Sequence, residues 1–272
     1  MIIVIDGLNK DRYTGLLDQM YQLRARVFAD RLGWDVTVRD GKEIDQFDAL
    51  DPAYVLGVND DGRVVACVRA LQTTGPHMLA DVFSDILRGE PPLRSATLWE
   101  STRFCVDTQV LERGKSRNSV SYATCALMAG SLEYAKNSGI SDIVTVIDPV
   151  MNRVLQRSDC APYGYVGETT PMGKVPAMAA LLDCTDERIA KIRAFAGIEG
   201  DIFLDPARCE ALADPVEQAP MDVVDDSLEF YCREQVAQAT TEEERVAAWA
   251  LMSRLRDVGM IAGRERLVGG YR

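Results

Sequence analysis

Apolar residues recur along the first third of the chain in patterns typical of one strand, one helix and one hairpin. Residues 2–5 (IIVI) predict a short strand, and helical spacing of apolar positions predicts a helix over 11–32 that Gly33 is placed to end. Two apolar runs, 54–58 and 63–71, flank the turn NDDG and predict a β-hairpin. Between the helix and the hairpin, residues 39–52 lack periodicity and are expected to form a loop rich in carboxylates.

The middle of the chain alternates between strand-like and helix-like segments. We expect strands at 98–106, 142–147, 163–168 and 175–184, with helices at 119–139 and 149–157. Hairpins mixed with crossovers predict an α/β fold with a mixed central sheet and helices on both faces.

The pattern changes after Cys184, where a short helix (187–195) and an acidic, proline-containing stretch precede two expected helices near 224–239 and 241–259. We therefore divide the chain into a domain of residues 1–184 and an acidic, mainly helical extension of residues 185–272. The last helix has an amphipathic pattern that needs a surface to bury it. That surface is either the extension's own core or a second subunit, so a homodimer through the extension is open.

Composition excludes several classes of function. The 272 residues carry a formal charge of −12, which disfavours binding to nucleic-acid phosphates, and the chain has no apolar run of the roughly 20 residues that a membrane helix needs. The first residues do not resemble a signal peptide, so a cytoplasmic location is expected. Seven isolated cysteines and a single histidine, His77, indicate neither a disulfide framework nor a metal site. Chemistry must rest on carboxylates and arginines.

Two charged residues lie inside strands that are otherwise apolar. Arg69 and Glu100 would be expensive to bury without partners, and the simplest interpretation is a salt bridge between them. Glu100 and Arg103 are separated by an odd number of residues and would point to opposite faces of a regular strand. If both serve one site, the strand must contain a bulge.

A second group of residues has the chemistry that S-adenosylmethionine requires. Arg24 and Phe28 are neighbours on one face of the first helix, Trp34 follows its end, and the carboxylate loop comes next. An arginine can bind a carboxylate in bidentate fashion, aromatic faces and acids suit a sulfonium, and carboxylates accept from an amine. Each feature alone is weak, but together they indicate one site.

This array resembles the acyl-homoserine-lactone synthases residue by residue, from position 24 to position 103, and the general similarity extends to about residue 184. The matching positions are Arg24, Phe28 and Trp34 in RARVFADRLGW, Glu43, Asp45 and Asp48 in EIDQFD, Arg69 in CVRAL, Phe83 in LADVF, and Glu100 and Arg103 in WESTRF. Residues 185–272 are not explained by the resemblance.

The resemblance implies a GNAT-like three-layer α/β/α sandwich whose central sheet is splayed between the strands near 98–106 and 142–147. It implies acyl transfer from acyl carrier protein, or acyl-CoA, to the amine of S-adenosylmethionine, followed by lactone closure with release of methylthioadenosine. The phosphopantetheine arm of the donor would lie in the splay, and no permanently bound cofactor is needed. Glu100 would be the catalytic base, or would only hold Arg69 and Arg103 in place, and Glu43 and Arg69 would form supporting ion pairs. S-adenosylmethionine would contact Arg24, Phe28, Trp34, Asp45, Asp48, Phe83 and Arg103.

The resemblance also locates the acyl group and the donor. Relatives that make 3-oxo products often carry a threonine at the position of Thr145, although a β-branched residue in a strand needs no such reason. Met128 and Met151 would line the acyl pocket, and methionine is equally common as an ordinary filler of cores. An acidic carrier protein would need a basic patch. Candidates for it are Arg113, Lys115, Arg117, Arg153 and Arg157.

Two alternatives remain. A GNAT-type N-acetyltransferase using acetyl-CoA would need a pyrophosphate-binding loop after the first splayed strand, which LERGKSRN matches only loosely. A non-catalytic acyl or carrier-protein binding module would have to retain three arginines and four carboxylates without a reaction to use them.

Overall fold

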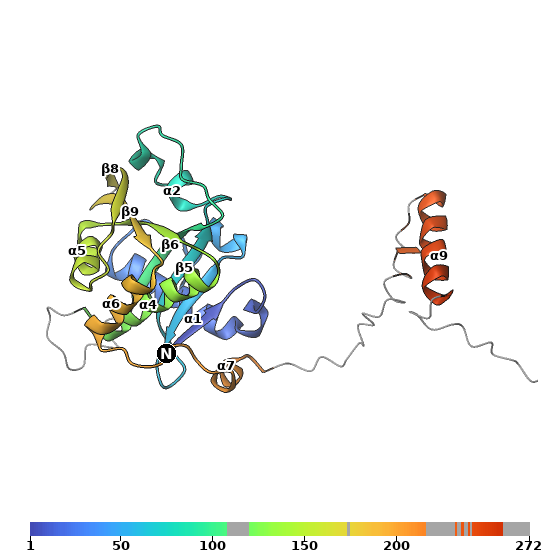
Figure 1. The fold of residues 1–272 in the computed structure, drawn as a ribbon, viewed down its shortest axis with the longest axis horizontal. Coiled ribbons are helices and arrows are strands. Elements are labelled where there is room, and N and C mark those ends of the chain that lie inside the picture. The colour runs from blue at the N-terminus through green and yellow to red at the C-terminus, as the bar shows by residue number, and fades with distance from the viewer. Residues whose placement is uncertain are drawn as a thin grey trace, which may run out of the picture. The chain divides into compact units, whose positions relative to one another are not determined.

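The computed structural model describes residues 1–107, 120–172 and 175–215, and from the remainder residues 232, 235–236, 239 and 241–257. It divides into two compact units, Met1–Pro215 and Val216–Arg272. The first unit therefore extends beyond the boundary that we placed at residue 184. Figure 1 shows its layers.

The first unit is built on a sheet of seven strands in the order β1-β4-β5-β6-β7-β9-β8. Every neighbouring pair is antiparallel except β6 and β7, which are parallel. The strands are β1 (Ile2–Ile5), β4 (Ala53–Val58), β5 (Val64–Gln72), β6 (Leu98–Val106), β7 (Asp142–Ile147), β8 (Gly164–Met172) and β9 (Val175–Asp183), and a separate hairpin pairs β2 (Val38–Arg39) with β3 (Lys42–Glu43).

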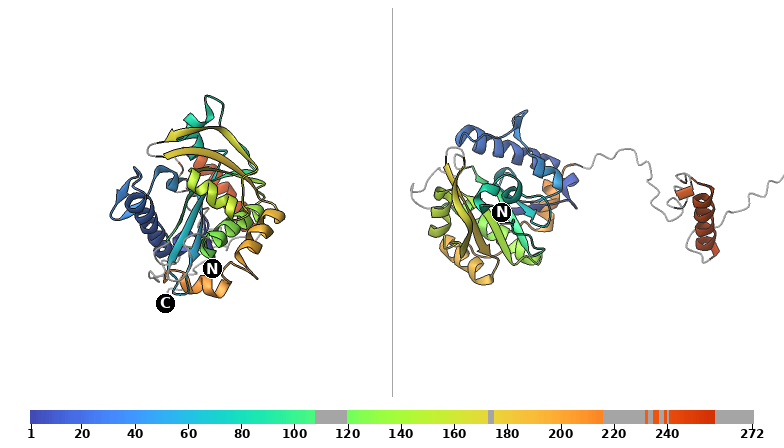
Figure 2. Two further views of the ribbon diagram at one scale, coloured as in Figure 1. Left: turned by 90° about the vertical axis from the view of Figure 1, so that its left-hand side faces the viewer. Right: turned by 90° about the horizontal axis from the view of Figure 1, so that it is seen from above.

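Helices cover both faces of this sheet, as the left view of Figure 2 shows. The α-helices of the first unit are α1 (Thr14–Arg24), α2 (Met78–Asp81), α4 (Tyr122–Asn137), α5 (Pro149–Arg157), α6 (Asp186–Ala196) and α7 (Pro206–Leu212); shorter helical turns are η1 (Lys10–Arg12), η2 (Ala25–Arg31), η3 (Gln46–Leu50) and η4 (Ser84–Leu87). The expected layered α/β architecture with a mixed sheet is confirmed.

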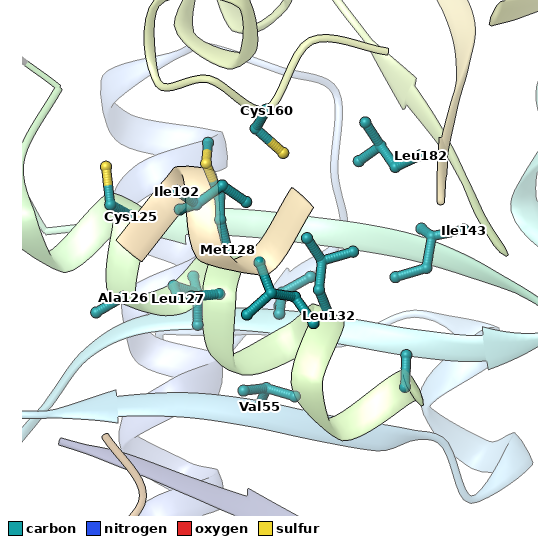
Figure 3. Close-up of a cluster of buried hydrophobic side chains, with 14 of the residues drawn as sticks. Val55, Cys125, Ala126, Leu127, Met128, Leu132, Ile143, Cys160, Leu182 and Ile192 are labelled. Carbon is teal, nitrogen blue, oxygen red and sulfur yellow. The ribbon is translucent and has the colours of Figure 1, made fainter. Parts of the chain in front are cut away.

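The main core lies between α4 and the sheet. Apolar residues of α4 such as Leu127 and Leu132 pack with Val55 and Ile143 of the strands, and Ile192 of α6 covers the same cluster. Figure 3 shows these side chains converging. Because α6 completes this core, it belongs with the sheet and not with a separate extension.

The C-terminal end of the first unit also supports its N-terminal half. The side chain of Asp214 accepts hydrogen bonds from the backbone amides of Thr14 and Gly15 at the start of α1. These amides have no partner within their own helix, so a carboxylate there caps it and complements the helix dipole. On the first strand, Ile2 exchanges backbone hydrogen bonds with Ile202 and Leu204.

The parallel pairing of β6 and β7 is short. It begins at Leu98 with Asp142 and ends at Ser101 with Thr145, although both strands continue. The two strands therefore separate after this pair, which confirms the expected splay between 98–106 and 142–147.

In the second unit the structure describes the helix α9 (Glu242–Asp257). Met252 is buried against Cys232, whereas Val246 and Trp249 are exposed. The expected helix over 241–259 is confirmed in this range. The helix expected near 224–239 lies almost entirely outside the described residues.

Candidate active site

The helix expected over 11–32 changes character before its end. It is regular as α1 and then widens through η2, where the amide of Leu32 donates to the carbonyl of Val27, five residues earlier. Such wide turns occur often at functional sites. Gly33, with φ of 61°, ends the helix in the left-handed conformation that glycine favours. Phe28 lies in the widened turn and Arg24 ends the regular helix.

The carboxylate loop is ordered by its own side chains. Asp45 precedes η3, and its carboxylate accepts from the amide of Phe47 at 2.9 Å, while Asp48 accepts from the amide of Asp45 at 2.8 Å. This reciprocal arrangement is a capping box, which a polar residue followed three positions later by an acid allows. Local sequence thus presents both carboxylates to the sheet together.

Three arginines and three carboxylates form one network beneath this loop. Arg24 donates to Glu43 at 2.6 Å and to Asp48 in bidentate fashion. In the same network, Arg69 donates to Asp45 and Asp48, and Arg103 pairs with Glu43 and Asp45. Opposite charges are equal in number, so the network compensates its own charge in a buried position.

The network has a buried layer and a layer that reaches solvent. The side chains of Arg24, Arg69 and Glu43 are fully buried, whereas those of Arg103 and Asp45 keep 10% and 18% of their exposure. Burial acts to raise the pKa of Asp48, but the charges and hydrogen bonds of Arg24 and Arg69 outweigh it and hold that pKa below its usual range. Asp48 is therefore held ionised.

The expected salt bridge between Arg69 and Glu100 is wrong. Glu100 is fully buried, and its two oxygens accept from the backbone amides of Met78 and Leu79, each at 2.6 Å. Arg69 faces the carboxylate loop because Asp45 and Asp48 provide bidentate partners there. Burial raises the pKa of Glu100 to about 7, and the two amide bonds limit the rise.

Strand β6 contains the bulge that was predicted for the case in which Glu100 and Arg103 serve one site. Arg69 pairs with Thr102 and Cys67 pairs with Cys105, so β6 has one residue more than β5 between these pairs. Arg103 lies in this interval with φ of 55°, an uncommon conformation for a residue other than glycine. The bulge turns Arg103 into the network, while Glu100 points to the loop that begins α2.

Aromatic side chains form one wall above the network. The rings of Phe28 and Trp34 are stacked with centroids 5.1 Å apart, and the guanidinium of Arg103 lies 5.6 Å from the centroid of Phe28. Phe28 is buried, whereas Trp34 is 41% exposed. Phe83 also lines the space beyond, and it packs against two hydrophobic clusters at the same time.

These groups border a cavity of about 1340 Å³ that runs from the network into the splay between β6 and β7. Its polar end includes Glu43, Asp45 and Arg103. Its apolar end adjoins the main core, since Met128, Leu132, Ile143, Cys160 and Leu182 line the cavity and also belong to that core. Figure 3 shows these five side chains within the core. The cavity can therefore hold a polar, charged group next to a long apolar one.

The expected acyl-pocket residues all line this cavity. Met128 of α4, Met151 of α5 and Thr145 of β7 border its apolar part. The hydroxyl of Thr145 donates to the backbone carbonyl of Ser101 at 2.9 Å, across the last residue pair before the strands separate.

The geometry agrees with what sequence comparison shows. A match to the family described as "Autoinducer synthase" covers residues 9–192. The chain belongs to the autoinducer synthase family. An acyl-homoserine-lactone synthase from Agrobacterium fabrum is 39% identical over 181 residues, which are 66% of this chain and 85% of that protein. The expected activity, acyl-homoserine-lactone synthesis, is thereby confirmed.

Solved structures show the same relationship. The acyl-homoserine-lactone synthase LasI is 30% identical with a TM-score of 0.61, over 74% of this chain and 98% of that one. A CoA-dependent acyl-homoserine lactone synthase, MesI, is 28% identical with a TM-score of 0.64, over 75% and 100%.

In this autoinducer synthase, the expected carrier-protein patch is only partly visible. Arg153 and Arg157 are exposed on α5, the helix whose other side borders the cavity. Arg113, Lys115 and Arg117 lie outside the described residues, so their position relative to α5 stays a prediction.

Several residues at the site were not anticipated from the sequence. The sulfur of Met78 lies 3.3 Å from Arg69 and 3.4 Å from Arg103, and Thr102 accepts from Arg69 at 3.0 Å while lining the cavity. Thr102 could have been found, because it is two positions from Glu100 and alternate residues of a strand share a face. Nothing in the loop sequence around Met78 marks that residue.

Two absences apply to the part of the chain that the structure describes. Within it, no group of three or more His, Cys, Asp or Glu side chains could hold a metal ion. Its helices include none that is long and apolar enough to cross a membrane.

Proposed function

We propose that this synthase binds S-adenosylmethionine at the polar end of the cavity and the acyl thioester in the splay between β6 and β7. The observation that carries the proposal is the network of three arginines and three carboxylates opening into a cavity whose other end is the apolar core. A relative 26% identical, TofI, was solved in a ternary complex with an inhibitor and MTA, the abbreviation of methylthioadenosine.

Arg103 and Asp45 are the proposed direct contacts of S-adenosylmethionine, because they combine charge with access to the cavity. Arg103 would bind the substrate carboxylate, and Asp45 would accept from its amine. Phe28 and Trp34 would face the sulfonium, which an aromatic face attracts. Binding would replace the present ion pair between Arg103 and Asp45 by two contacts to the substrate.

Arg24, Asp48 and Arg69 have a different proposed role. They do not line the cavity, and most of their hydrogen bonds join them to other members of the network, with further bonds from Arg69 to Thr102 and from Tyr54 to Asp48. We assign them to holding Glu43 and Asp45 in place, which fixes the direct contacts before the substrate arrives. Preorganised charge of this kind contributes to catalysis because it needs no rearrangement during the reaction.

The reaction then needs two bond exchanges. The neutral α-amine attacks the thioester carbonyl, forming an amide and releasing the thiol of the donor. A carboxylate oxygen of the same molecule next attacks its γ-carbon, breaking the carbon–sulfur bond and releasing methylthioadenosine with the closed lactone. An α-amine titrates near 7.7–8.0, so little assistance is required to deprotonate it.

Glu100 is proposed as a positioning residue and not as the base that contacts the amine. It does not line the cavity, and both its oxygens already accept from the amides that begin α2. It therefore holds the segment that carries Met78 and Phe83 against the cavity. This replaces the role expected from the resemblance, for the physical reason that the carboxylate has no free path to the substrate.

The acyl chain would lie between the separated strands, with its thioester near Ser101. Beyond the last paired residues, the facing edges of β6 and β7 are not joined by the ladder, so their backbone groups are available to a phosphopantetheine arm. The donor is either acyl carrier protein or acyl-CoA; MesI is CoA-dependent. The exposed Arg153 and Arg157 on α5 favour an acidic carrier protein.

One assay tests the proposal. The purified protein is incubated with S-adenosylmethionine and acyl thioesters of either carrier, and methylthioadenosine and acyl-homoserine lactone are measured by mass spectrometry. We expect both products in equal amounts. Failure to form either product with any chain length on either carrier would overturn the proposed reaction, and N-acyl-S-adenosylmethionine without methylthioadenosine would overturn lactone closure.

The choice of donor is tested separately. Changing Arg153 and Arg157 together to Glu should raise the KM for acyl carrier protein substrates severalfold and leave kcat and the KM for acyl-CoA unchanged. Equal KM values for the variant and the parent protein would refute the patch on α5.

A further inference from the structure

Met78 is joined to the active site by both its backbone and its side chain. Its amide donates to Glu100 at 2.6 Å, and its sulfur lies 3.3 Å from Nη2 of Arg69 and 3.4 Å from Nη1 of Arg103. The residue is 5% exposed and lines the cavity. A thioether sulfur has no hydrogen to donate, so it accepts from two guanidinium groups at once.

These two contacts close a ring with Asp45. One carboxylate oxygen of Asp45, Oδ2, accepts from Nη2 of Arg69 at 2.9 Å and lies 2.8 Å from Nη2 of Arg103. Asp45 and Met78 therefore bridge the same pair of arginines. Because two guanidinium groups repel each other, each bridge that places an acceptor between them helps to keep them side by side.

The two arginines are not held equally. Arg69 is fully buried, and it also donates to Asp48 at 2.7 Å and to Thr102 at 3.0 Å. Arg103 lies in the bulge of β6, keeps 10% of its side-chain exposure and is held on its Nε side by Glu43. Arg69 is thus the fixed partner, and a bridge to Arg69 fixes the outer end of Arg103.

Binding of the substrate as proposed removes one bridge and leaves the other. Asp45 exchanges its pair with Arg103 for the substrate amine, and Arg103 takes the substrate carboxylate. The sulfur of Met78 is uncharged, so it does not repel that carboxylate, whereas a second acid at this position would. A polarisable thioether can therefore remain beside both guanidinium groups throughout binding.

We propose that Met78 is a positioning residue for S-adenosylmethionine, whose sulfur keeps Arg103 in place while the substrate displaces Asp45. This inference rests on the proposed function, and it adds the route by which Glu100 acts on the substrate. Glu100 accepts from the amide of Met78 at the start of α2 and so fixes the position of the sulfur.

Replacing Met78 by Leu keeps the apolar volume and removes the acceptor. We expect the KM for S-adenosylmethionine to rise about three- to tenfold, the range of one modest hydrogen bond. The KM for the acyl thioester should change less than about twofold, because the acyl group lies at the other end of the cavity. Met78→Gln returns an uncharged acceptor, and it should recover a large part of the lost affinity.

Met20→Leu is the matched control. Met20 is fully buried in the apolar cluster that α1 forms with the sheet, so this change removes a buried sulfur far from any proposed substrate contact. It should leave both KM values unchanged. All variants are made in the full-length enzyme, and urea unfolding confirms that each is folded before kinetics and calorimetric titration with S-adenosylmethionine.

A double variant tests the route from Glu100. Glu100→Gln replaces one acceptor oxygen by an NH2 group that opposes a backbone amide, which disturbs the segment that begins α2. If Glu100 acts through Met78, the KM for S-adenosylmethionine in the double variant with Met78→Leu should not exceed that of the more affected single variant. A rise equal to the product of the two single effects would refute this route.

The outcomes separate this inference from the function on which it rests. A parent enzyme that forms the lactone, together with an unchanged KM for S-adenosylmethionine in Met78→Leu or an equal rise in Met20→Leu, would overturn the inference and leave the synthase activity intact. A rise in Met78→Leu that Met78→Gln does not reduce would assign the effect to packing and overturn it as well. Absence of product from the parent enzyme with every donor would instead contradict the proposed function.

Discussion

Replacing Glu43 by Gln should destabilise the first unit more than any exposed charge change. Glu43 is fully buried and joins Arg24, at 2.6 Å, to Arg103, at 2.9 Å. Glutamine has nearly the same shape but no charge, so the buried guanidinium of Arg24 and the largely buried guanidinium of Arg103 would face one carboxylate less. The network would then carry an uncompensated positive charge.

The magnitude follows from these contacts. At an effective dielectric constant of about 20, each close ion pair contributes roughly 4 kcal/mol of attraction. Part of this is offset because Glu43 no longer has to be desolvated, which leaves a net loss of about 3–5 kcal/mol, the usual result of removing one partner from a buried pair. A domain of this size has a total stability of only about 5–15 kcal/mol, so the loss should be large.

Urea unfolding followed by tryptophan fluorescence measures this loss as a lower midpoint at unchanged slope. The matched control is Glu168→Gln, since Glu168 pairs with Arg88 at 3.0 Å but both side chains are more than half exposed. The control should change the stability by no more than about 1 kcal/mol. A loss below about 1 kcal/mol in Glu43→Gln, or an equal loss in the control, would refute the idea that Glu43 compensates two buried charges.

Three further predictions follow from the structure. The pKa of Glu100 is raised to about 7 from 4.5, so the folded state binds more protons than the unfolded state between these pH values, and stability should fall by about 3 kcal/mol at most as pH rises through this window. Unfolding curves measured at several pH values should show this fall in the parent protein and a flatter pH profile in Glu100→Gln. The same pH dependence in both proteins would contradict the raised pKa. Asp45→Asn should raise the KM for S-adenosylmethionine about tenfold or more, with a smaller effect on the KM for the acyl donor. Steady-state kinetics with each substrate varied in turn measure both constants, and an equal rise in the two KM values would refute a direct contact between Asp45 and S-adenosylmethionine. A fragment of residues 1–215 should fold cooperatively and retain synthase activity, whereas a fragment of residues 1–184 should not, because it lacks α6 and the cap at Asp214. Circular dichroism and product assays on both fragments test this. A folded and active fragment of residues 1–184 would support the boundary expected from the sequence.

The sequence alone determined the elements and the family. Strands at 2–5, 98–106 and 142–147 and the helix at 149–157 were predicted with the bounds that the structure has, because apolar periodicity and capping residues act locally. The sequence also predicted a bulge between Glu100 and Arg103 on the condition that both serve one site, since residues an odd number apart in a regular strand point to opposite faces. The motif residues indicated S-adenosylmethionine chemistry before any contact was known.

The pairing of charges was decided by tertiary structure. Nothing local shows that Arg69 faces Asp45 and Asp48 while Glu100 turns to the amides of Met78 and Leu79. That choice depends on which strand lies beside which loop, and on the advantage of placing bidentate partners opposite each guanidinium. The domain boundary was likewise set by packing, because α6 contributes to a core that it shares with residues of β1, β4 and α4, which are distant in the sequence.

The direction of a single hydroxyl was also beyond the reach of the sequence. A threonine at position 145 can donate or accept, and only the pairing of β7 with β6 brings the backbone carbonyl of Ser101 close enough to take its hydrogen. The sequence thus fixes which functional groups are available, because residue type sets charge and hydrogen-bonding capacity. Tertiary structure decides which partners consume that capacity, and so what remains for the substrate.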